Sequence, residues 1–410
     1  MSLPYERGSL LPDTAADMAK LRAAWSIVER RHGEGTLFNF TGLERSLDLG
    51  DADASVLDDD LAPALYGERL TELALEHLGG DPERDDVFVA NRLTAAIVAS
   101  MQVLVRPGDT VLGVSARYSH PVVVRAVQLA GGEFLDSTGH EGFAAHVDRD
   151  PKLVVLTRLA VSYEALDADE LEAIVAETER RGLPVFVDDA GGARVGPAVF
   201  GQPRTLELGA VAGATGLDKY GTTGPRLGLL AGRAELVGRI RARGVELGLE
   251  ARPMLYPAVV RSLEQYRPER VRELVDSTMA LADALEARFP WAARTPVAVK
   301  LEGEDVLAEA AARAGVQVTD CHLVPYEATA ALAMLLLRDH GILTVHFAAL
   351  PPGTSALLLK LLPPETLERF GGPERFAAAV DESLDALAGL VADRESLAGL
   401  LGLSVLSAQS

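Results

Sequence analysis

Lysine is scarce in this chain, and one lysine stands in a setting suited to covalent chemistry. The 410 residues contain 39 Lys and Arg together, of which only five are lysines, at positions 20, 152, 219, 300 and 360. Lys219 follows the strand-like stretch LGAVAGAT within a glycine-rich segment, where a backbone can approach a ligand closely. A desolvated amine loses its charge and can attack an aldehyde. A surface lysine in a loop is the alternative interpretation.

Two adjacent acids end the strand-like run VFVDD, upstream of Lys219. A carboxylate at the carboxyl end of a parallel strand points into the crevice where α/β sheets bind ligands. Asp188 could there hold the ring nitrogen of a pyridine-type cofactor in its protonated state, with the small Ala190 beneath the ring. The alternative is that Asp188 and Asp189 only cap the following turn.

Further polar and aromatic residues follow other strand-like runs. Asn91 and Thr94 lie where a strand leads into a helix, so the free N–H groups of the helix N-terminus could bind a phosphate, although ordinary capping would look the same. Arg226 adds a guanidinium that could contact the same phosphate. Tyr118 and His120 offer flat rings for stacking on an aromatic cofactor, but a single histidine is more often structural or exposed.

The pattern of elements predicts how these residues are positioned. Between residues 86 and 230, short β-branched runs alternate with amphipathic helical stretches, which is typical of a parallel sheet with crossover helices. After residue 232 the sequence predicts long helices and a smaller α+β domain. The strand candidates are 86–90, 110–114, 153–157, 185–187, 210–212, 297–301, 316–319, 342–347 and 356–362, and the longest helix candidate is 262–288. The expected domains are an N-terminal segment (1–50), a large domain (51–250), and a linking helix with a small C-terminal domain (251–410).

The amino-acid composition argues against several classes of binding partner. Sixty acidic residues against 39 basic ones give a formal charge of −21, and such a surface repels nucleic acids and anionic lipids. The single Cys321 excludes an intrachain disulfide and a cysteine-rich metal site, and we expect no metal centre. The sequence shows neither a secretory leader nor a run of about 18 uncharged apolar residues. It therefore predicts a soluble cytoplasmic protein that binds no membrane.

Taken in order, the phosphate-type turn, the ring residue, the VDDA motif and the Asp-Lys pair in a glycine-rich segment resemble the fold type I pyridoxal-phosphate enzymes, the aspartate aminotransferase superfamily. The likeness covers about residues 35–395. It implies an α/β fold with a mostly parallel seven-stranded sheet between helices, plus a smaller C-terminal α+β domain. Within the superfamily, TGLDKYGTTGPRLGLLAGR and FNFTGLERS are most similar to selenocysteine synthase and the selenocysteine synthase-like group.

The resemblance implies pyridoxal 5′-phosphate as the cofactor and a role for each matched residue. Lys219 would form the Schiff base and shuttle protons, Asp188 would hold the pyridine nitrogen, and His120 would stack on the ring, with Tyr118 as the alternative. Tyr66 lies where family dimers send a residue into the neighbouring site, which implies a homodimer or larger homo-oligomer with shared active sites. The residues at the cofactor phosphate would be Asn91, Arg92, Thr94, Arg226 and, as a weaker candidate, Thr215.

Two departures from the family pattern bear on the substrate. Many fold type I enzymes bind the substrate carboxylate through an arginine in a late strand, where this chain has Lys360, a point charge without the planar fork of arginine. Arg45 and Arg158 are the other candidates for that role. Selenocysteine synthase holds a transfer RNA, and a charge of −21 without an N-terminal basic tract argues against a nucleic-acid substrate.

These observations together predict a PLP-dependent lyase or transferase. It would act on a small free amino acid or derivative by Cα deprotonation to a carbanion, followed by β- or γ-elimination or replacement. An aminotransferase or racemase on the same scaffold is one alternative. A catalytically idle, cofactor-binding regulatory subunit is another, because fold alone does not fix function.

Overall fold

The computed structural model describes residues 3–347 and 350–403, which form two compact units. The large unit is Glu44–Arg272, and the small unit combines Met1–Leu43 with Glu273–Ser410. This division differs from the expected domain boundaries. The N-terminal segment belongs to the small unit because β1 (Phe38–Asn39) pairs with β11 (Ile342–Leu343). The large unit extends past residue 250 because α9 (Tyr256–Glu264) packs against α2 (Leu61–Leu78).

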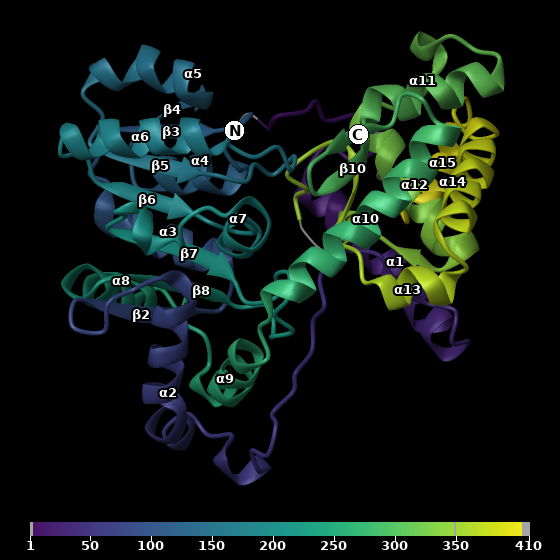
Figure 1. Ribbon diagram of the computed structural model, residues 1–410. Helices are drawn as coiled ribbons and strands as arrows, with labels where there is room; N and C mark the ends of the chain where they lie inside the picture. Colours follow the sequence, from purple (N-terminus) through teal and green to yellow (C-terminus); the bar gives the residue numbers. More distant parts are fainter. Residues whose placement is uncertain (1–2, 348–349, 404–410) are drawn as a thin grey trace. The chain divides into compact units, whose positions relative to one another are not determined.

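A seven-stranded sheet of order β2-β8-β7-β6-β5-β3-β4 forms the centre of the large unit (Figure 1). Its strands are β2 (Asp85–Ala90), β3 (Thr110–Ser115), β4 (Glu133–Thr138), β5 (Leu153–Thr157), β6 (Val185–Asp188), β7 (Ala212–Gly216) and β8 (Gly228–Arg233). Only β8 runs against its neighbours, since it pairs antiparallel with both β2 and β7. The mostly parallel α/β sheet is therefore confirmed, and the other six strands end along one edge.

Helices cover both faces of this sheet because both faces are apolar. Val155 and Phe186 belong to one buried cluster, whereas their neighbours Leu156 and Val187 belong to another, as expected when successive strand residues point to opposite faces. The first face packs against α3 (Leu93–Leu104), α4 (Pro121–Leu129) and α8 (Ala234–Glu246). The second packs against α2, α5 (Gly139–His146), α6 (Ala168–Arg180), α7 (Gly192–Phe200) and α9.

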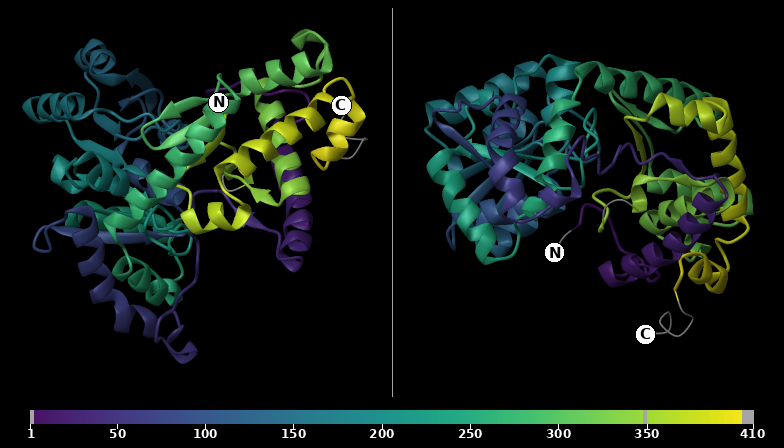
Figure 2. Two further views of the ribbon diagram at one scale, coloured as in Figure 1. Left: turned by 45° about the vertical axis from the view of Figure 1, so that its right-hand side comes forward. Right: turned by 90° about the horizontal axis from the view of Figure 1, so that it is seen from below.

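The small unit is built around α12 (Pro325–His340), in which every residue from Tyr326 to Leu337 is buried. An antiparallel sheet of order β12-β10-β9 and the parallel β1-β11 pair accompany it. α1 lies beside α12 (Figure 2). The remaining elements are α1 (Thr14–Gly33), β9 (Ala293–Thr295), β10 (Ala298–Leu301), α11 (Gly303–Ala314), β12 (Leu357–Lys360), α13 (Pro364–Phe370), α14 (Pro373–Ala388), α15 (Arg394–Leu400) and most of α10 (Pro268–Arg288).

Some elements differ from the sequence expectation. The strand candidate 316–319 is a 3₁₀ turn at Val318–Asp320, and the candidate 342–347 is a strand only at β11. The helix candidate 262–288 is two helices, because Pro268 begins α10 as a new helix. The strand expected at 210–212 starts at Ala212 and continues to Gly216, and the strands β1, β4, β8 and β9 are additional.

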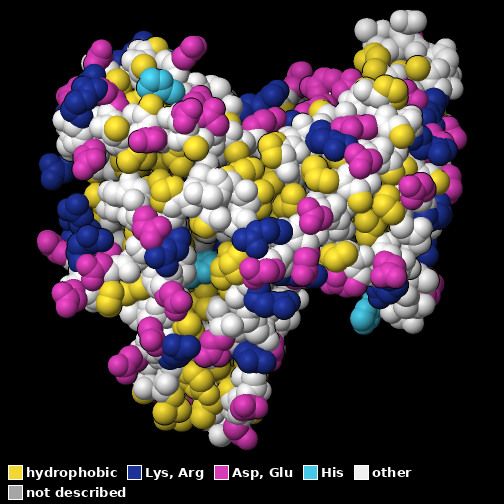
Figure 3. Space-filling view, viewed as in Figure 1, with side chains coloured by type: hydrophobic (Ala, Val, Ile, Leu, Met, Phe, Trp, Pro, Cys, Tyr) yellow, Lys and Arg dark blue, Asp and Glu magenta, His cyan; other side chains and the backbone are white. Residues whose placement is uncertain are grey.

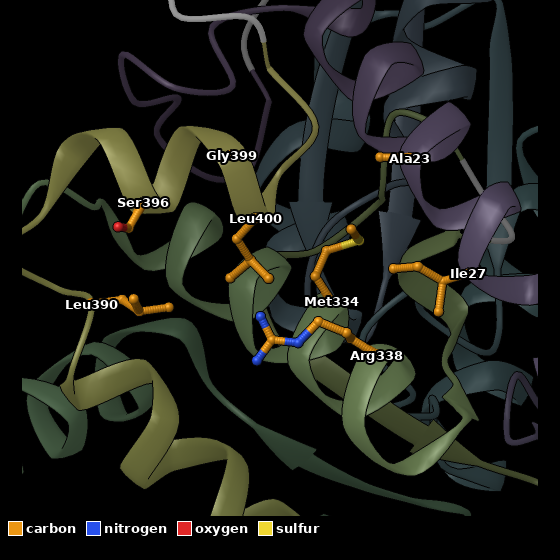
Figure 4. Close-up of a pocket in the computed structure, with 8 residues that line it drawn as sticks. All are labelled: Ala23, Ile27, Met334, Arg338, Leu390, Ser396, Gly399 and Leu400. Carbon is orange, nitrogen blue, oxygen red and sulfur yellow. The ribbon is translucent and has the colours of Figure 1, made fainter.

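A pocket of about 450 Å³ opens in the small unit (Figure 4). Its lining residues are Ala23, Ile27, Met334, Arg338, Leu390, Ser396, Gly399 and Leu400. Arg338 is the charged member, and its guanidinium pairs with Asp339, so the pocket presents no group suited to proton transfer. Across the described parts of the chain, no helix combines the length and the apolar character needed to cross a bilayer.

Candidate active site

Four segments meet at the edge of the large unit where the parallel strands end (Figure 1). Residues 91–94 follow β2, residues 116–120 follow β3, and Asp188 ends β6. The turn with Lys219 follows β7 and leads through Arg226 into β8, which starts at this edge because it runs the opposite way. The sheet topology thus brings the sequence-predicted residues to one ligand-binding edge.

Asp188 is a buried acid with an open hydrogen-bonding position. Its side chain is 3% exposed, and Oδ1 has no hydrogen-bond partner within the described residues. Burial and the neighbouring charge of Asp189 raise the pKa of Asp188 to about 7, while the Lys219 amine opposes the shift. A cationic N–H donor at Oδ1 would satisfy this oxygen and keep the carboxylate ionised. A protonated pyridine nitrogen is such a donor, so Asp188 fits the cofactor.

Asp189, in contrast, is fully satisfied. Arg158 binds it through two hydrogen bonds, Nε to Oδ1 at 3.0 Å and Nη2 to Oδ2 at 2.6 Å, and both side chains are completely buried. The Thr205 hydroxyl donates to Oδ2 at 2.7 Å. Gly192 makes room for this pair, since a Cβ there would lie 2.2 Å from the Asp189 carboxylate. The guanidinium of Arg158 is therefore engaged inside the unit and is not available to a substrate carboxylate.

Lys219 is held in a turn fixed by its own neighbours. The Thr222 hydroxyl donates to the carbonyl of Leu217 at 2.9 Å, and the Thr222 amide donates to the carbonyl of Lys219 at 3.1 Å. Burial lowers the pKa of the Lys219 amine; Asp218 opposes this, and Arg226, Arg45 and Arg194 add to it. The surroundings of Lys219 thus make its amine easier to deprotonate than that of an exposed lysine.

Arg45 reaches the same turn, where its Nε lies 2.9 Å from Oδ2 of Asp218. The Asp218 side chain is almost fully buried, whereas that of Arg45 is 33% exposed. Lys219, Arg45 and Arg226 together lower the pKa of Asp218 despite its burial. Because only the Nε contact is made, the terminal nitrogens of Arg45 can still face a ligand.

His120 is placed by the loop that joins β3 to α4. Its Nδ1 accepts a hydrogen bond from the Val122 amide at 3.1 Å and so caps α4. The preceding Ser119 donates to Asp136 through its amide at 3.0 Å and its hydroxyl at 2.7 Å, which fixes the loop. Burial, with a contribution from Lys219, lowers the pKa of His120 to about 4. The ring is therefore neutral near pH 7 and suited to stacking; Tyr118, two residues earlier, lies half-buried in the same loop.

The start of α3, where the sequence predicts an anion site, leaves backbone N–H groups uncapped by a side chain. Arg92 is the N-cap residue, and no side chain caps this helix, so first-turn N–H groups remain for a ligand. Gly228 packs tightly here, since a Cβ on it would lie 2.6 Å from the carbonyl oxygen of Arg92. Loss of hydration and the cations of Arg92 and Arg45 lower the pKa of Arg226 to about 10. Three arginines therefore concentrate positive charge at this end of the edge.

Two candidate phosphate ligands are partly engaged elsewhere. The Asn91 side-chain amide donates to the carbonyl of Gly248 at 3.3 Å, and its backbone N–H donates to the carbonyl of Leu249 at 2.9 Å, so its Oδ1 remains for a ligand. The buried Thr215 hydroxyl donates to the carbonyl of Ala190 at 3.1 Å and accepts from Arg194 at 2.8 Å. Thr215 thus links two segments of the edge, whereas Thr94 lies half-buried in the first turn of α3.

Lys360 and Tyr66 occupy other surroundings. Lys360 lies on β12 of the small unit, where its Nζ donates to the carbonyl of Thr41 at 3.1 Å. This carbonyl belongs to the Asn-Phe-Thr-Gly turn, in which Asn39 Oδ1 accepts from the Thr41 amide and hydroxyl. Tyr66 lies half-buried on α2, against the apolar cluster between this helix and the sheet.

The structure also adds residues that the sequence analysis did not single out. Asp218 joins Arg45 to the lysine turn, and Arg194 reaches the end of β7 from α7. The signal for Arg194 is an arginine in the otherwise small and apolar stretch AGGARVG, where a long cation would not be expected without a buried role.

The fold is that of fold type I PLP enzymes. An aspartate aminotransferase from Thermotoga maritima superposes with a TM-score of 0.56 at 15% identity, covering 90% of this chain and 96% of that one. A ureidoglycine-glyoxylate aminotransferase from Bacillus subtilis gives a TM-score of 0.55 at 16% identity, covering 88% and 96%. At these identities the likeness establishes the fold alone.

Sequence comparison gives the family. A UPF0425 pyridoxal phosphate-dependent protein of Methanothermobacter thermautotrophicus is 31% identical over 81% of this chain and 83% of that protein. A second one, from Methanopyrus kandleri, is 31% identical over 88% and 94%. The chain belongs to the UPF0425 family of pyridoxal phosphate-dependent proteins. No family model matches the chain, and the narrower likeness to selenocysteine synthase stays a prediction.

Proposed function

We propose that this protein is a PLP-dependent enzyme that acts on a small free amino acid or derivative by elimination or replacement at the β- or γ-carbon. The observation that carries the proposal is the open carboxylate oxygen of Asp188, buried at the strand edge that also presents Lys219. Relatives at 31% identity are named for pyridoxal phosphate. When bound, this cofactor withdraws electrons from the substrate and makes the Cα proton acidic.

Each site residue then has a defined task. Lys219 would hold the cofactor covalently through Nζ, and its neutral amine would take the Cα proton of the substrate. Asp188 would keep the ring nitrogen protonated, and His120 would support the ring face, with Tyr118 as the alternative. The phosphate would be held by the start of α3 and nearby side chains, namely Asn91, Arg92, Thr94 and Arg226, with Thr215 the weaker candidate.

For a leaving group X on the β-carbon, the reaction balances without an external oxidant or reductant. The Cα–H and Cβ–X bonds break, water supplies the keto oxygen, and the products are a 2-keto acid, ammonium and HX. In a replacement, a nucleophile takes the position of X. Lys219 supplies the one proton transfer that every variant of this chemistry needs.

The substrate carboxylate has two candidate partners on this chain. Arg158 is committed to Asp189, which leaves Arg45 and Lys360. Arg45 keeps free terminal nitrogens beside the lysine turn and offers a planar fork to a carboxylate. Lys360 donates from Nζ to the Thr41 carbonyl and would act as a point charge.

We further propose that the enzyme works in the cytoplasm as a homodimer or larger homo-oligomer. Leu61 and Leu65 lie one turn apart on α2 and are 49% and 61% exposed. Figure 3 shows hydrophobic side chains gathered at the lower end of the large unit, where Figure 1 places α2. A second copy of the chain would cover them and bring Tyr66 toward the neighbouring site.

The direct test is a visible absorption band on addition of pyridoxal phosphate. We expect wild-type protein to gain the band and Lys219→Ala to lose both the band and all turnover, because no other amine can replace Nζ. Lys152→Ala is the matched control, since Lys152 is 52% exposed and pairs with Asp150; it should behave as wild type. Wild-type protein that takes up no pyridoxal phosphate would refute the proposal.

The products separate the reaction types. A lyase should release a 2-keto acid and ammonia from an amino acid that carries a leaving group. An aminotransferase should instead convert the cofactor to its pyridoxamine form, and a racemase should exchange the Cα proton without net product. A protein that gains the band and does none of these would be a regulatory subunit, which would contradict the enzymatic proposal.

A further inference from the structure

Arg194 is a buried cation without a partner acid. It projects from α7, its side chain is fully buried, and its Nη1 donates to the Thr215 hydroxyl and to the carbonyl of Gly216, both at 2.8 Å. Its Nε and Nη2 have no hydrogen-bond partner, and no carboxylate of the described chain lies within ion-pair distance. Burying a guanidinium without a counter-charge strongly destabilises the folded state. We therefore expect the charge to serve a purpose other than stability.

Arg158 shows what a purely structural buried arginine looks like in the same unit. It is equally buried, yet it makes a two-bond contact with Asp189 and a further bond to the carbonyl of Pro203. Its charge is neutralised at once. Arg194 donates only to neutral acceptors, so its positive charge is not neutralised and acts on the ionisable groups around it.

The contacts of Arg194 join the two catalytic segments. Gly216 and Thr215 end β7, three and four residues before Lys219. The Thr215 hydroxyl also donates to the carbonyl of Ala190, two residues after Asp188. One guanidinium therefore braces the strand end that leads to the lysine against the strand end that carries the acid.

We propose that Arg194 is a positioning residue for Lys219: it fixes the end of β7 and supplies a buried positive charge that disfavours protonation of the Lys219 amine. This inference rests on the proposed function, because it assigns Lys219 as the reacting amine. It adds a residue from α7 to that site and explains why the charge remains unpaired. A partner acid would cancel the effect on the amine.

The charges around both groups agree with this assignment. Four titratable groups of the described chain face Arg194. They are His77 on α2, Asp189 at the end of β6, Asp218 in the lysine turn and Tyr266 after α9. Burial lowers the pKa of Arg194 to about 10, opposed by the last three of these groups. The groups facing Lys219 are Asp218, which raises the pKa of its amine, and Arg226, Arg45 and Arg194, which lower it. Asp188 and His120 face it as well, since the Lys219 charge lowers the pKa of both.

Two substitutions separate the brace from the charge. Arg194→Met removes both, whereas Arg194→Lys keeps the charge but not the two simultaneous contacts. In the holoprotein, the pH midpoint of the visible band reports protonation of the Lys219 nitrogen. We expect Arg194→Met to raise this midpoint by about one unit and Arg194→Lys to leave it close to wild type. The exposed Arg180→Met is the matched control and should not shift it.

A second measurement uses the apoprotein and needs no cofactor. Amide hydrogen exchange over residues 213–222 should become faster in Arg194→Met and in Arg194→Lys, because both lose the brace, while the rest of the sheet stays protected. If Arg194→Met does not fold, Arg194→Gln serves as the neutral variant.

An unchanged midpoint in the neutral variant, or unchanged exchange over residues 213–222 in both, would overturn the inference even if Lys219→Ala abolishes the band. A wild-type protein without the band would instead refute the proposed function. The exchange experiment would still decide whether Arg194 braces β7.

Discussion

Both units of this protein bury charged side chains, but the small-unit cluster around Asp17 pairs its charges, whereas the strand edge of the large unit leaves some of its charged groups open. There, Asp17 is fully buried, binds Arg7 at 2.8 Å, and accepts a hydrogen bond from the Tyr326 hydroxyl. Lys20 lies on the other side of the same carboxylate. At the strand edge of the large unit, by contrast, Asp188 has an open oxygen and Arg194 has two open nitrogens.

The difference indicates what each cluster is for. An unsatisfied buried polar group destabilises the folded state, so it persists where a ligand or a reaction uses it. The cluster of Arg7, Asp17 and Tyr326 holds the N-terminal segment against α12 and acts on stability. The open groups at the strand edge are suited to a cofactor, and Asp189 beside them belongs to the paired, structural type.

Asp188→Asn tests the open type and should have the largest effect on activity. Because an amide cannot keep the ring nitrogen protonated, turnover should fall on the order of a hundredfold or more. The substitution should not destabilise the apoprotein, since it removes a carboxylate that lacks a partner. Steady-state turnover and urea unfolding of the apoprotein check the two halves.

The pH dependence of the same variant has a defined sign. The pKa of Asp188 is raised to about 7 in the folded state, so between pH 4 and 7 the folded protein binds more protons at this group than the unfolded chain, and stability falls as pH rises. The stability gained by Asp188→Asn should therefore grow from pH 4 and level off above pH 7, at roughly 2–4 kcal/mol. A pH-independent difference would count against an unpaired carboxylate.

Asp189→Asn tests the paired type one residue away. It leaves the fully buried Arg158 without a counter-charge, so we expect a loss of about 3 kcal/mol in the free energy of unfolding. Asp17→Asn, which weakens the small-unit cluster, should cost a similar amount. Equal stability of the Asp188 and Asp189 variants would show that the two acids do not differ in the way the geometry indicates.

The sequence predicts which strand ends carry the reactive side chains better than it predicts which of those side chains have a charged partner. Lys219, Asp188 and the start of α3 can be identified because each follows a strand-like run, and parallel strands end at one edge. Nothing local distinguishes Asp188 from Asp189. Their difference arises because the successive residues Asp188 and Asp189, at the end of β6, point in opposite directions, and Arg158 lies on the side of Asp189 only.

The domain boundaries show the same limit. The alternation of strands and helices predicts the large sheet, but the N-terminal segment joins the small unit through β1 and β11, which are 304 residues apart at Phe38 and Ile342. Such a long-range pair leaves no periodic signal in the segment itself. Likewise, Lys20 reads as a polar helix residue, although the packing of α1 buries it completely.

Lys20 is the least well paired member of the small-unit cluster. Its Nζ lies 3.7 Å from the Asp17 carboxylate and 3.5 Å from the Tyr326 hydroxyl, and burial lowers its pKa to about 8 against the pull of Asp17. Between pH 8 and 10.5 the unfolded chain binds more protons at this group, so stability should rise with pH. Lys20→Met should therefore be more stable than wild type by about 2 kcal/mol at pH 7, a gap that closes toward pH 10. Urea unfolding at four pH values measures it, and a constant gap would show that Lys20 is well compensated.

The smallest expected effect lies inside the active-site edge itself. The buried Thr205 hydroxyl donates to Asp189 Oδ2 at 2.7 Å, and this bond completes the pair with Arg158. Thr205→Val keeps the shape and removes the bond, so the free energy of unfolding should fall by about 1 kcal/mol. The absorption band and turnover should stay unchanged, because Arg158 still engages both carboxylate oxygens of Asp189. A variant that keeps its stability but loses the band would place Asp189 in the cofactor site and would remove the distinction between open and paired acids at this edge.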